Sequence, residues 1–343
     1  MPKKLINKSC PQGTTTTGII NGVSSGIIDL NNIRYQWAYD LWEIMLNNTW
    51  FPKEVDISNE AKKYKELNES EKFLYDSALA QLIFMDSLQT NNTVDNVNPW
   101  VTAPEVNMVL IRQSFEEALH SQSYAVLTDS VSTNSAEIYE KWRTDNNLED
   151  KNDFILHIYE KYAPLCEQGD TVAKIYMIVA NQCLEGIYFY SGFAALYALA
   201  RAGKMIGSAQ MIRFIQRDEI THLQLFANIF KEIKKEFPEA FTQEVIDTIY
   251  KMFDSAAKQE IKWGKHMIKG GILGLTDTII EDFVQELVND RLFAIGMKGL
   301  YEPKEKEAIP WFNDFSKINN LKTNFFEGNN AAYSKGSLDL NDF

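Results

Sequence analysis

Residues 114–127 read SFEEALHSQSYAVL and place three reactive side chains in one row. Glu117 is followed by His120 three residues later and by Tyr124 after four more. Residues three or four positions apart share one face of an α-helix. The stretch therefore predicts a helix with a carboxylate, an imidazole and a phenol on the same side. Because the rest of the helix is largely apolar, we expect it to turn these polar groups towards the protein interior.

Long helical patterns continue on both sides of this stretch. Apolar periodicity predicts helices over residues 31–48, 69–88, 104–132, 153–162, 171–201, 207–235, 242–269 and 277–297. Alternating strand patterns are nearly absent, so the predicted fold class is all-α, a bundle of long helices. Residues 1–28 contain TTTTG and SSG and predict a flexible N-terminal arm. The polar end of the chain, GNNAAYSKGSLDLNDF, predicts a disordered tail.

The composition excludes several classes of function. The chain has 343 residues, 45% of them hydrophobic, which is enough for a large core. Its formal net charge is −13, which repels phosphate groups, so neither nucleic acid nor an anionic membrane is an expected partner. The three cysteines form no CxxC pair. They indicate reduced thiols in a cytoplasmic protein rather than disulfides or a zinc site.

One segment, residues 175–200, has the hydropathy of a membrane span. Glu185 is its only charge and divides it into apolar runs of 10 and 15 residues. Both runs are shorter than the roughly 20 residues that a span needs. The segment therefore predicts a helix buried on all sides in a soluble bundle, in which Glu185 requires a polar partner.

The Glu-x-x-His spacing occurs twice in the predicted helices, as Glu117 with His120 and as Glu219 with His222. Side chains at positions i and i+3 lie about 4.5 Å apart along a helix axis, so both can reach one metal ion. A buried carboxylate needs a nearby cation, or else it takes up a proton. The other two of the four histidines, His157 and His266, are interpreted as ordinary helix residues.

Two more carboxylates lie in apolar helical surroundings. Asp86 lies in ALAQLIFMDSL on the face expected to point inward, and Glu185 lies in VANQCLEGIYFYSGF. Four helices thus supply four acids and two imidazoles, the ligand pattern of ferritin-like di-iron and di-manganese proteins. This mixture of ligands favours iron or manganese, since zinc more often recruits cysteine or additional histidine.

Six segments carry a wider similarity. In chain order they are NTWFPKEVDIS, LAQLIFMDSLQ, EEALHSQSYAV, LEGIYFYSGF, IRFIQRDEITH and the terminal NDF. Together they resemble the small, radical-generating beta subunit of class I ribonucleotide reductase, over roughly residue 29 to the end. The resemblance implies a ferritin-like dimetal domain over residues 29–322. It also implies a C-terminal tail over residues 323–343 that docks on the large, catalytic alpha subunit.

The resemblance assigns roles to the clustered residues. The implied cofactor is a pair of iron ions, with two manganese ions as the second choice. The implied metal ligands are Asp86, Glu117, His120, Glu185, Glu219 and His222. Tyr124 would be the residue that the oxygen-activated metal pair oxidises to a stable radical. Phe189, Phe193 and Ile215 would shield that radical in an apolar pocket.

The same resemblance implies a route for electrons and the partners of the chain. Asp218 would bind both His120 and Trp50, and this relay would carry an electron to the metals. Tyr333, in the tail, would pass the radical to the large subunit, which holds the nucleotide and reduces it to the deoxy form. A homodimer is implied as well. Two alternatives stay open: an iron-storage protein, and a dimetal oxidase or monooxygenase of the same superfamily.

Gly192 departs from the best-known iron-dependent relatives, which have serine at this position. The manganese-dependent group, which is activated by a flavoprotein, has glycine there. We expect Gly192 to widen a path for an oxidant. The remainder of the chain resembles the iron-type group more closely, so iron remains the first choice.

Overall fold

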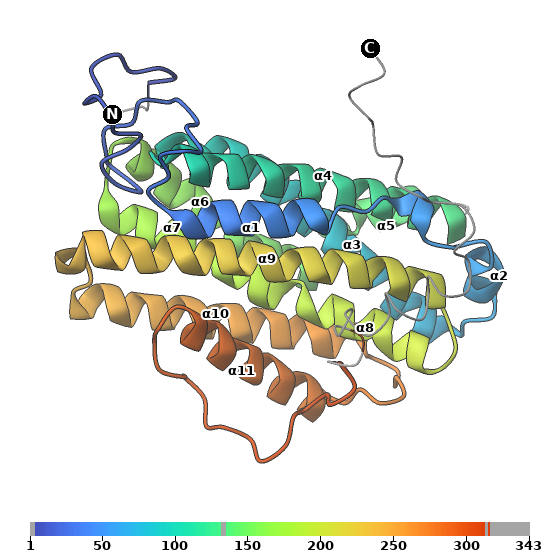
Figure 1. Ribbon diagram of the computed structural model, residues 1–343. Coiled ribbons are helices and arrows are strands. Elements are labelled where there is room, and N and C mark those ends of the chain that lie inside the picture. Colours follow the sequence, from blue (N-terminus) through green and yellow to red (C-terminus); the bar gives the residue numbers. More distant parts are fainter. Residues whose placement is uncertain (1–3, 132–134, 313–314, 316–343) are drawn as a thin grey trace, which may run out of the picture.

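The computed structural model describes residues 4–131, 135–312 and 315. Within these residues the regular structure is helical, and strand-like pairing is limited to isolated bridges. The helices are α1 (Gln36–Asn47), α2 (Glu60–Lys65), α3 (Glu69–Asn92), α4 (Pro104–Val131), α5 (Ser135–Thr144), α6 (Asn146–Glu167), α7 (Thr171–Cys183), α8 (Tyr190–Arg201), α9 (Ile206–Glu236), α10 (Gln243–Met267) and α11 (Asp277–Ala294). The shorter turns are η1 (Pro52–Glu54), η2 (Thr93–Val97), η3 (Asn98–Trp100), η4 (Leu184–Tyr188) and η5 (Pro238–Ala240). The long helices lie side by side in one elongated bundle (Figure 1), which confirms the predicted all-α class.

Local sequence explains where several of these helices begin. At the start of α3, the Asn68 side chain accepts a hydrogen bond from the Glu71 amide, and the Glu71 carboxylate accepts one from the Asn68 amide. This reciprocal pair satisfies amides that a helix start leaves unbonded. Thr242 and Thr276 cap α10 and α11 with their side chains in a similar way.

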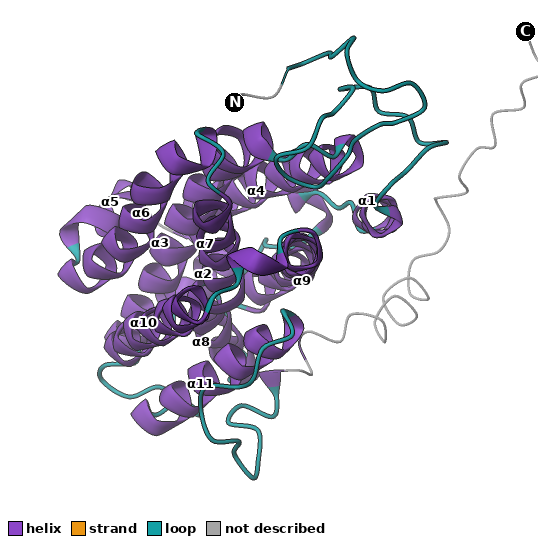
Figure 2. Ribbon diagram, turned by 90° about the vertical axis from the view of Figure 1, so that its left-hand side faces the viewer, coloured by secondary structure: helices purple, strands orange, loops and turns teal. Residues whose placement is uncertain are grey.

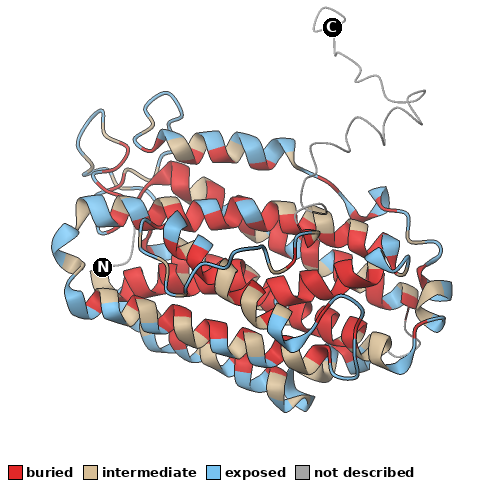
Figure 3. Ribbon diagram, turned by 90° about the horizontal axis from the view of Figure 1, so that it is seen from below, coloured by how far each residue is buried: buried red, intermediate tan, exposed pale blue. Residues whose placement is uncertain are grey.

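The centre of the bundle is formed by α3, α4, α9 and the α7–η4–α8 segment. Figure 3 shows buried residues concentrated on the inner helices, while the outer helices expose one face. Both α3 and α4 bury residues on most sides, as expected for helices surrounded by others. These central helices carry the polar residues singled out in the sequence.

The predicted helix over residues 171–201 is interrupted at its middle. The π-helical turn η4 separates α7 from α8, and Glu185 lies within it. Hydropathy does not reveal this turn, because the residues on both sides are uniformly apolar. By length and composition the segment Thr171–Arg201 resembles a membrane span, but 94% of its most apolar window is buried inside the bundle. It is therefore an interior helix, as predicted.

The main differences from the predicted helices lie in the outer layer. Helix α6 was expected to end before Pro164, and that prediction is wrong, because the helix continues to Glu167. The Pro164 carbonyl accepts from the Gln168 amide at 3.3 Å, so the chain completes another turn beyond the proline. Helices α2 and α5 were not predicted, since short polar helices have weak apolar periodicity.

The described residues before α1 form loops (Figure 2), which lie at one end of the bundle (Figure 1). Ile19 and Ile20 are completely buried, so part of this arm belongs to the core. The Ile19 amide donates to Glu236 Oε2 on α9 at 2.9 Å, and its carbonyl accepts from the Thr102 amide at 2.8 Å. The flexibility expected of residues 1–28 stays a prediction.

Candidate metal centre

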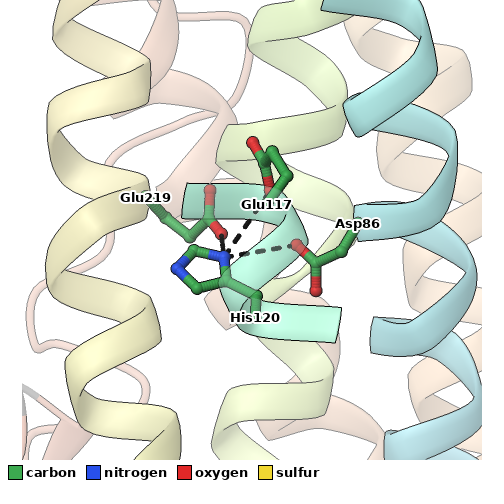
Figure 4. A group of neighbouring side chains, drawn as sticks. All are labelled: Asp86, Glu117, His120 and Glu219. Carbon is green, nitrogen blue, oxygen red and sulfur yellow. Dashed lines mark ion pairs between the residues drawn. The ribbon is translucent and has the colours of Figure 1, made fainter. Parts of the chain in front are cut away.

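The first cluster joins side chains from three helices. Asp86 comes from α3, Glu117 and His120 from α4, and Glu219 from α9, and all are completely buried. One ligand atom from each lies within 4.8 Å of the others. Figure 4 shows the three carboxylates directed at one ring nitrogen. His120 Nδ1 lies 3.2 Å from Glu219 Oε1, 3.5 Å from Asp86 Oδ1 and 3.6 Å from Glu117 Oε2.

A second cluster lies beside the first and shares two of its residues. It consists of Glu117, Glu185, Glu219 and His222, again with ligand atoms within 4.8 Å of one another. His222 Nδ1 lies 2.9 Å from Glu219 Oε2, 3.1 Å from Glu117 Oε1 and 3.6 Å from Glu185 Oε2. Glu117 and Glu219 therefore direct one oxygen to each histidine. Both carboxylates would therefore help to hold each of two adjacent metal ions.

Several ligand atoms of these clusters lack the partners that burial demands. Within the described residues, six have no hydrogen bond: Asp86 Oδ1 and Oδ2, Glu117 Oε2, His120 Nδ1, Glu185 Oε2 and Glu219 Oε1. Buried polar atoms are nearly always bonded, because leaving one unpaired costs about 1–3 kcal/mol. All six atoms lie on the predicted ligands. The donor set therefore fits a pair of metal ions.

The pKa shifts of the clustered residues also fit a pair of metal ions. Burial raises the pKa of Asp86 and the pKa of Glu185 well above their usual values. Burial alone would lower the pKa of His120 and the pKa of His222, but the surrounding carboxylates raise both well above the usual value. The clustered negative charge therefore favours bound protons where no metal ion is present. Metal ions would displace these protons, because carboxylate and imidazole ligands bind metals in their deprotonated forms.

Glu185 is held on the side that faces away from His222. Its Oε1 accepts from Gln89 Nε2 at 2.5 Å and from Gln113 Nε2 at 2.6 Å. These two amides fix the carboxylate on η4 and leave Oε2 for the second metal position. The sequence did not single out either glutamine, because a glutamine on a helix carries no distinctive signal.

The Nε2 atom of each histidine faces a carboxylate that directly precedes the glutamate of the other motif. His120 Nε2 lies 3.3 Å from Asp218 Oδ2 on α9, and His222 Nε2 lies 3.0 Å from Glu116 Oε2 on α4. A carboxylate at Nε2 favours a proton there and leaves the Nδ1 lone pair for a metal. The two helices therefore orient each other's imidazoles.

Glu116 is a site residue that the sequence interpretation missed. It directly precedes Glu117, as Asp218 directly precedes Glu219, so both motifs read acid-Glu-x-x-His. This repeat was the available signal. Glu116 Oε1 also pairs with Arg112 Nη2 at 2.9 Å, and the same nitrogen donates to the Met45 carbonyl at 3.1 Å. The pair therefore connects the second cluster to the end of α1.

Trp50 extends the first cluster towards α1. Its Nε1 donates to Asp218 Oδ2 at 2.7 Å, the oxygen that also faces His120. The Trp50 ring stacks on Phe214 with centroids 5.1 Å apart, which fixes its plane. The structure thus brings together the three residues of the predicted relay, Trp50, Asp218 and His120, in one continuous contact chain.

Tyr124 is completely buried one turn beyond His120. Its hydroxyl has no hydrogen-bond partner among the described residues. Burial, with the nearby charge of Asp86, raises the pKa of Tyr124 well above its usual value. Phe189, Phe193 and Ile215 are also completely buried. Their role as the lining of the Tyr124 pocket stays a prediction.

Two other expectations concern Gly192 and the predicted C-terminal tail. A Cβ atom at Gly192 would lie 3.3 Å from Gln81 Oε1 and 3.3 Å from Leu82 Cδ2. Side chains of α3 thus lie close to Gly192, so the glycine permits close packing of α8 on α3. That Gly192 widens a path for an oxidant stays a prediction. Tyr333 and the rest of the predicted tail from residue 323 lie outside the described residues.

Glu116 and Asp218, the carboxylates that face the Nε2 atoms of the two histidines, should each support a different metal position. Glu116→Gln is expected to lower Mn²⁺ affinity at the His222 position by about 10-fold, and Asp218→Asn to do the same at the His120 position, because each loses the charge that orients its imidazole. Titrating metal-free protein with Mn²⁺, followed by electron paramagnetic resonance of the free ion, measures both affinities. Each variant is the control for the other. Equal weakening of both positions by both variants would contradict the assignment.

Comparisons with known proteins agree with this geometry. Residues 27–308 match the family model described as ribonucleotide reductase, small chain. A ribonucleoside-diphosphate reductase subunit beta of Treponema pallidum is 38% identical over 328 residues, which cover 94% of this chain and 92% of that protein. The solved ribonucleotide reductase R2 subunit from Clostridium botulinum is 39% identical, with a TM-score of 0.87 over 92% of this chain and 99% of that one.

A more distant structure shares the fold alone. It is the dimanganese(II)-NrdF of Streptococcus sanguinis, which is 21% identical with a TM-score of 0.75 over 85% of this chain and 99% of that one. The family match, by contrast, spans the part of the chain that contains all six clustered ligands and Tyr124. The chain therefore belongs to the family of small, or beta, subunits of the oxidoreductase ribonucleotide reductase.

Proposed function

We propose that this beta subunit generates a stable tyrosyl radical at Tyr124 for an aerobic class I ribonucleoside-diphosphate reductase. The observation that carries the proposal is the pair of overlapping ligand clusters, buried beside a phenol without a hydrogen bond in the described structure. When bound, two redox-active metal ions supply, together with oxygen, the oxidising equivalent that removes an electron from the phenol. The large subunit uses that radical to reduce ribonucleotides.

The residues around Tyr124 prepare it for this role. Complete burial keeps water and reductants away from the ring. Asp86 is the carboxylate that acts most strongly on the phenol, so it is the proposed acceptor of the proton that Tyr124 loses on oxidation. Trp50 and Asp218 are the proposed route by which electrons reach or leave the centre, since they contact His120 without a gap.

The remaining parts of the proposal concern partners and metal. Tyr333 would carry the radical onward, and the tail over residues 323–343 would dock on the large subunit. The active form would be a homodimer in the cytoplasm. Carboxylate and imidazole ligands suit both iron and manganese. Iron is the proposed metal and manganese the second candidate, because most of the chain resembles the iron-type group more closely.

Reconstitution tests this proposal directly. Metal-free protein loaded with Fe²⁺ and exposed to air is expected to bind one ion at each of the two clusters and to show a sharp organic radical signal in electron paramagnetic resonance. The same protein loaded with Mn²⁺ compares the two metals. Metal uptake without a radical under either condition would favour an oxidase or monooxygenase. Spherical multi-chain cages in light scattering would favour iron storage.

A further inference from the structure

The π-turn η4 is bound by polar side chains that the metal centre does not use. The Tyr188 carbonyl, the last of the turn, accepts from Lys151 Nζ on α6 at 2.9 Å and also from Gln81 Nε2 on α3. The Ser191 amide, in the first turn of α8, donates to Glu260 Oε1 on α10 at 3.0 Å. Three separate helices therefore bind the junction between η4 and α8.

A π-turn explains why such bonds are needed. Its hydrogen bonds span one residue more than those of an α-helix, so the change back to α-helix leaves backbone groups without their regular partner. A buried backbone group without a partner costs free energy comparable to a lost hydrogen bond. Here side chains bind the carbonyl of Tyr188 and the amide of Ser191. Trp263 Nε1 in turn donates to Gln81 Oε1 at 2.5 Å, which fixes the amide that binds Tyr188.

Lys151 and Glu260 form an ion pair inside the core. Lys151 Nζ lies 2.5 Å from Glu260 Oε2, and both side chains are completely buried. Burial lowers the pKa of Lys151, and the charge of Glu260 offsets part of that effect. Replacing a buried ion pair by well-packed apolar residues is often neutral or stabilising. Packing alone therefore does not account for the pair, whereas its bonds to the two backbone groups do.

The metal ligand on this turn belongs to one cluster only. Glu185 is a member of the second cluster, and within the described chain no residue of η4 belongs to the first. Gln89 and Gln113 hold the Glu185 carboxylate, but they do not hold its backbone. The direction of its Cα–Cβ bond depends on the shape of η4.

We propose that Lys151 and Glu260 are positioning residues, which hold η4 as a π-turn and thereby direct Glu185 into the second metal position. The inference rests on the proposed function in that it requires the clusters to bind metal. Loss of the pair should change the second position and spare the first.

Lys151→Met tests the proposal in the full chain. It keeps an unbranched side chain of nearly the same length and removes the bonds to Tyr188 and Glu260. Mn²⁺ titration of metal-free protein is expected to show affinity about 10-fold weaker at one position and unchanged at the other, in the range found when residues that support metal ligands are altered. Anomalous scattering of manganese in crystals of the variant identifies the weakened position, which should be that of Glu185 and His222.

Two further variants make the result decisive. Lys151→Met/Glu260→Gln leaves no unpaired buried charge and should show the same selective weakening. Lys262→Met is the matched control, because Lys262 and Asp150 form an exposed 2.5 Å pair between the same two helices, α10 and α6. This control should bind Mn²⁺ like the unaltered protein.

The outcomes separate the inference from the proposed function. If the unaltered protein binds no pair of Mn²⁺ ions, the proposed function fails. If it binds two, but Lys151→Met and the double variant bind both normally or lose both equally, the inference is overturned. If neither variant folds by circular dichroism, the pair serves stability alone, and the inference is overturned as well.

Discussion

Tyr124→Phe is expected to bind metal like the unaltered protein and to lose both the sharp radical signal and reductase activity with the large subunit. The variant lacks the only group that can give up an electron and a proton together at this position. Its fold should be retained, because the Tyr124 hydroxyl has no hydrogen-bond partner in the described structure, so its removal leaves none unpaired. Electron paramagnetic resonance, metal analysis and a reductase assay measure the three properties.

A matched tyrosine controls for this change. Tyr159 is also buried, at 3% exposure, and its hydroxyl likewise has no partner among the described residues. Tyr159→Phe should keep both the radical and the activity. A radical of unchanged amplitude in Tyr124→Phe would contradict the proposed function.

Ending the chain after Glu327 is expected to abolish reductase activity with the large subunit while leaving metal binding and the Tyr124 radical intact. The deletion removes Tyr333 and the terminal NDF, the proposed relay and part of the proposed docking segment. It leaves every described helix complete. Activity and radical content are measured on the same preparation, together with binding of the large subunit by sedimentation.

A single substitution separates the two roles given to this segment. Tyr333→Phe in the full-length chain should still bind the large subunit but should not support turnover. Full activity of the truncated chain would show that residues 328–343 are dispensable, and the tail proposal would then fail.

The ligand set could be predicted because its signal is local. Glu-x-x-His spacing fixes two side chains on one helix face, and an acid within an apolar run, such as Asp86 or Glu185, needs a charged or polar partner wherever the helix packs. The sequence does not predict that the two clusters share Glu117 and Glu219. This sharing depends on how α4 and α9 lie against each other, which no spacing within one helix encodes.

The interior positions of Glu116, Lys151 and Glu260 were not predicted, for a related reason. An acid next to another acid, or a charge on an amphipathic helix, usually marks a solvent-facing position. Only the packed bundle shows that these charges point inward at 0–1% exposure. The π-turn at Glu185 was hidden as well, since uniform hydropathy does not indicate how many residues a turn contains. The close approach of Gln81 to Gly192 was not predicted either, because Gln81 comes from another helix.

The isolation of the Tyr124 phenol also bears on how long an oxidising charge can be stored. Reducing the radical requires an electron to reach this ring, and a reductant in solvent cannot contact a completely buried ring directly. The storage time should then be governed by rare opening motions of the surrounding bundle. Small polar reductants should therefore quench the radical slowly, at a rate that rises steeply with temperature and depends little on reductant size.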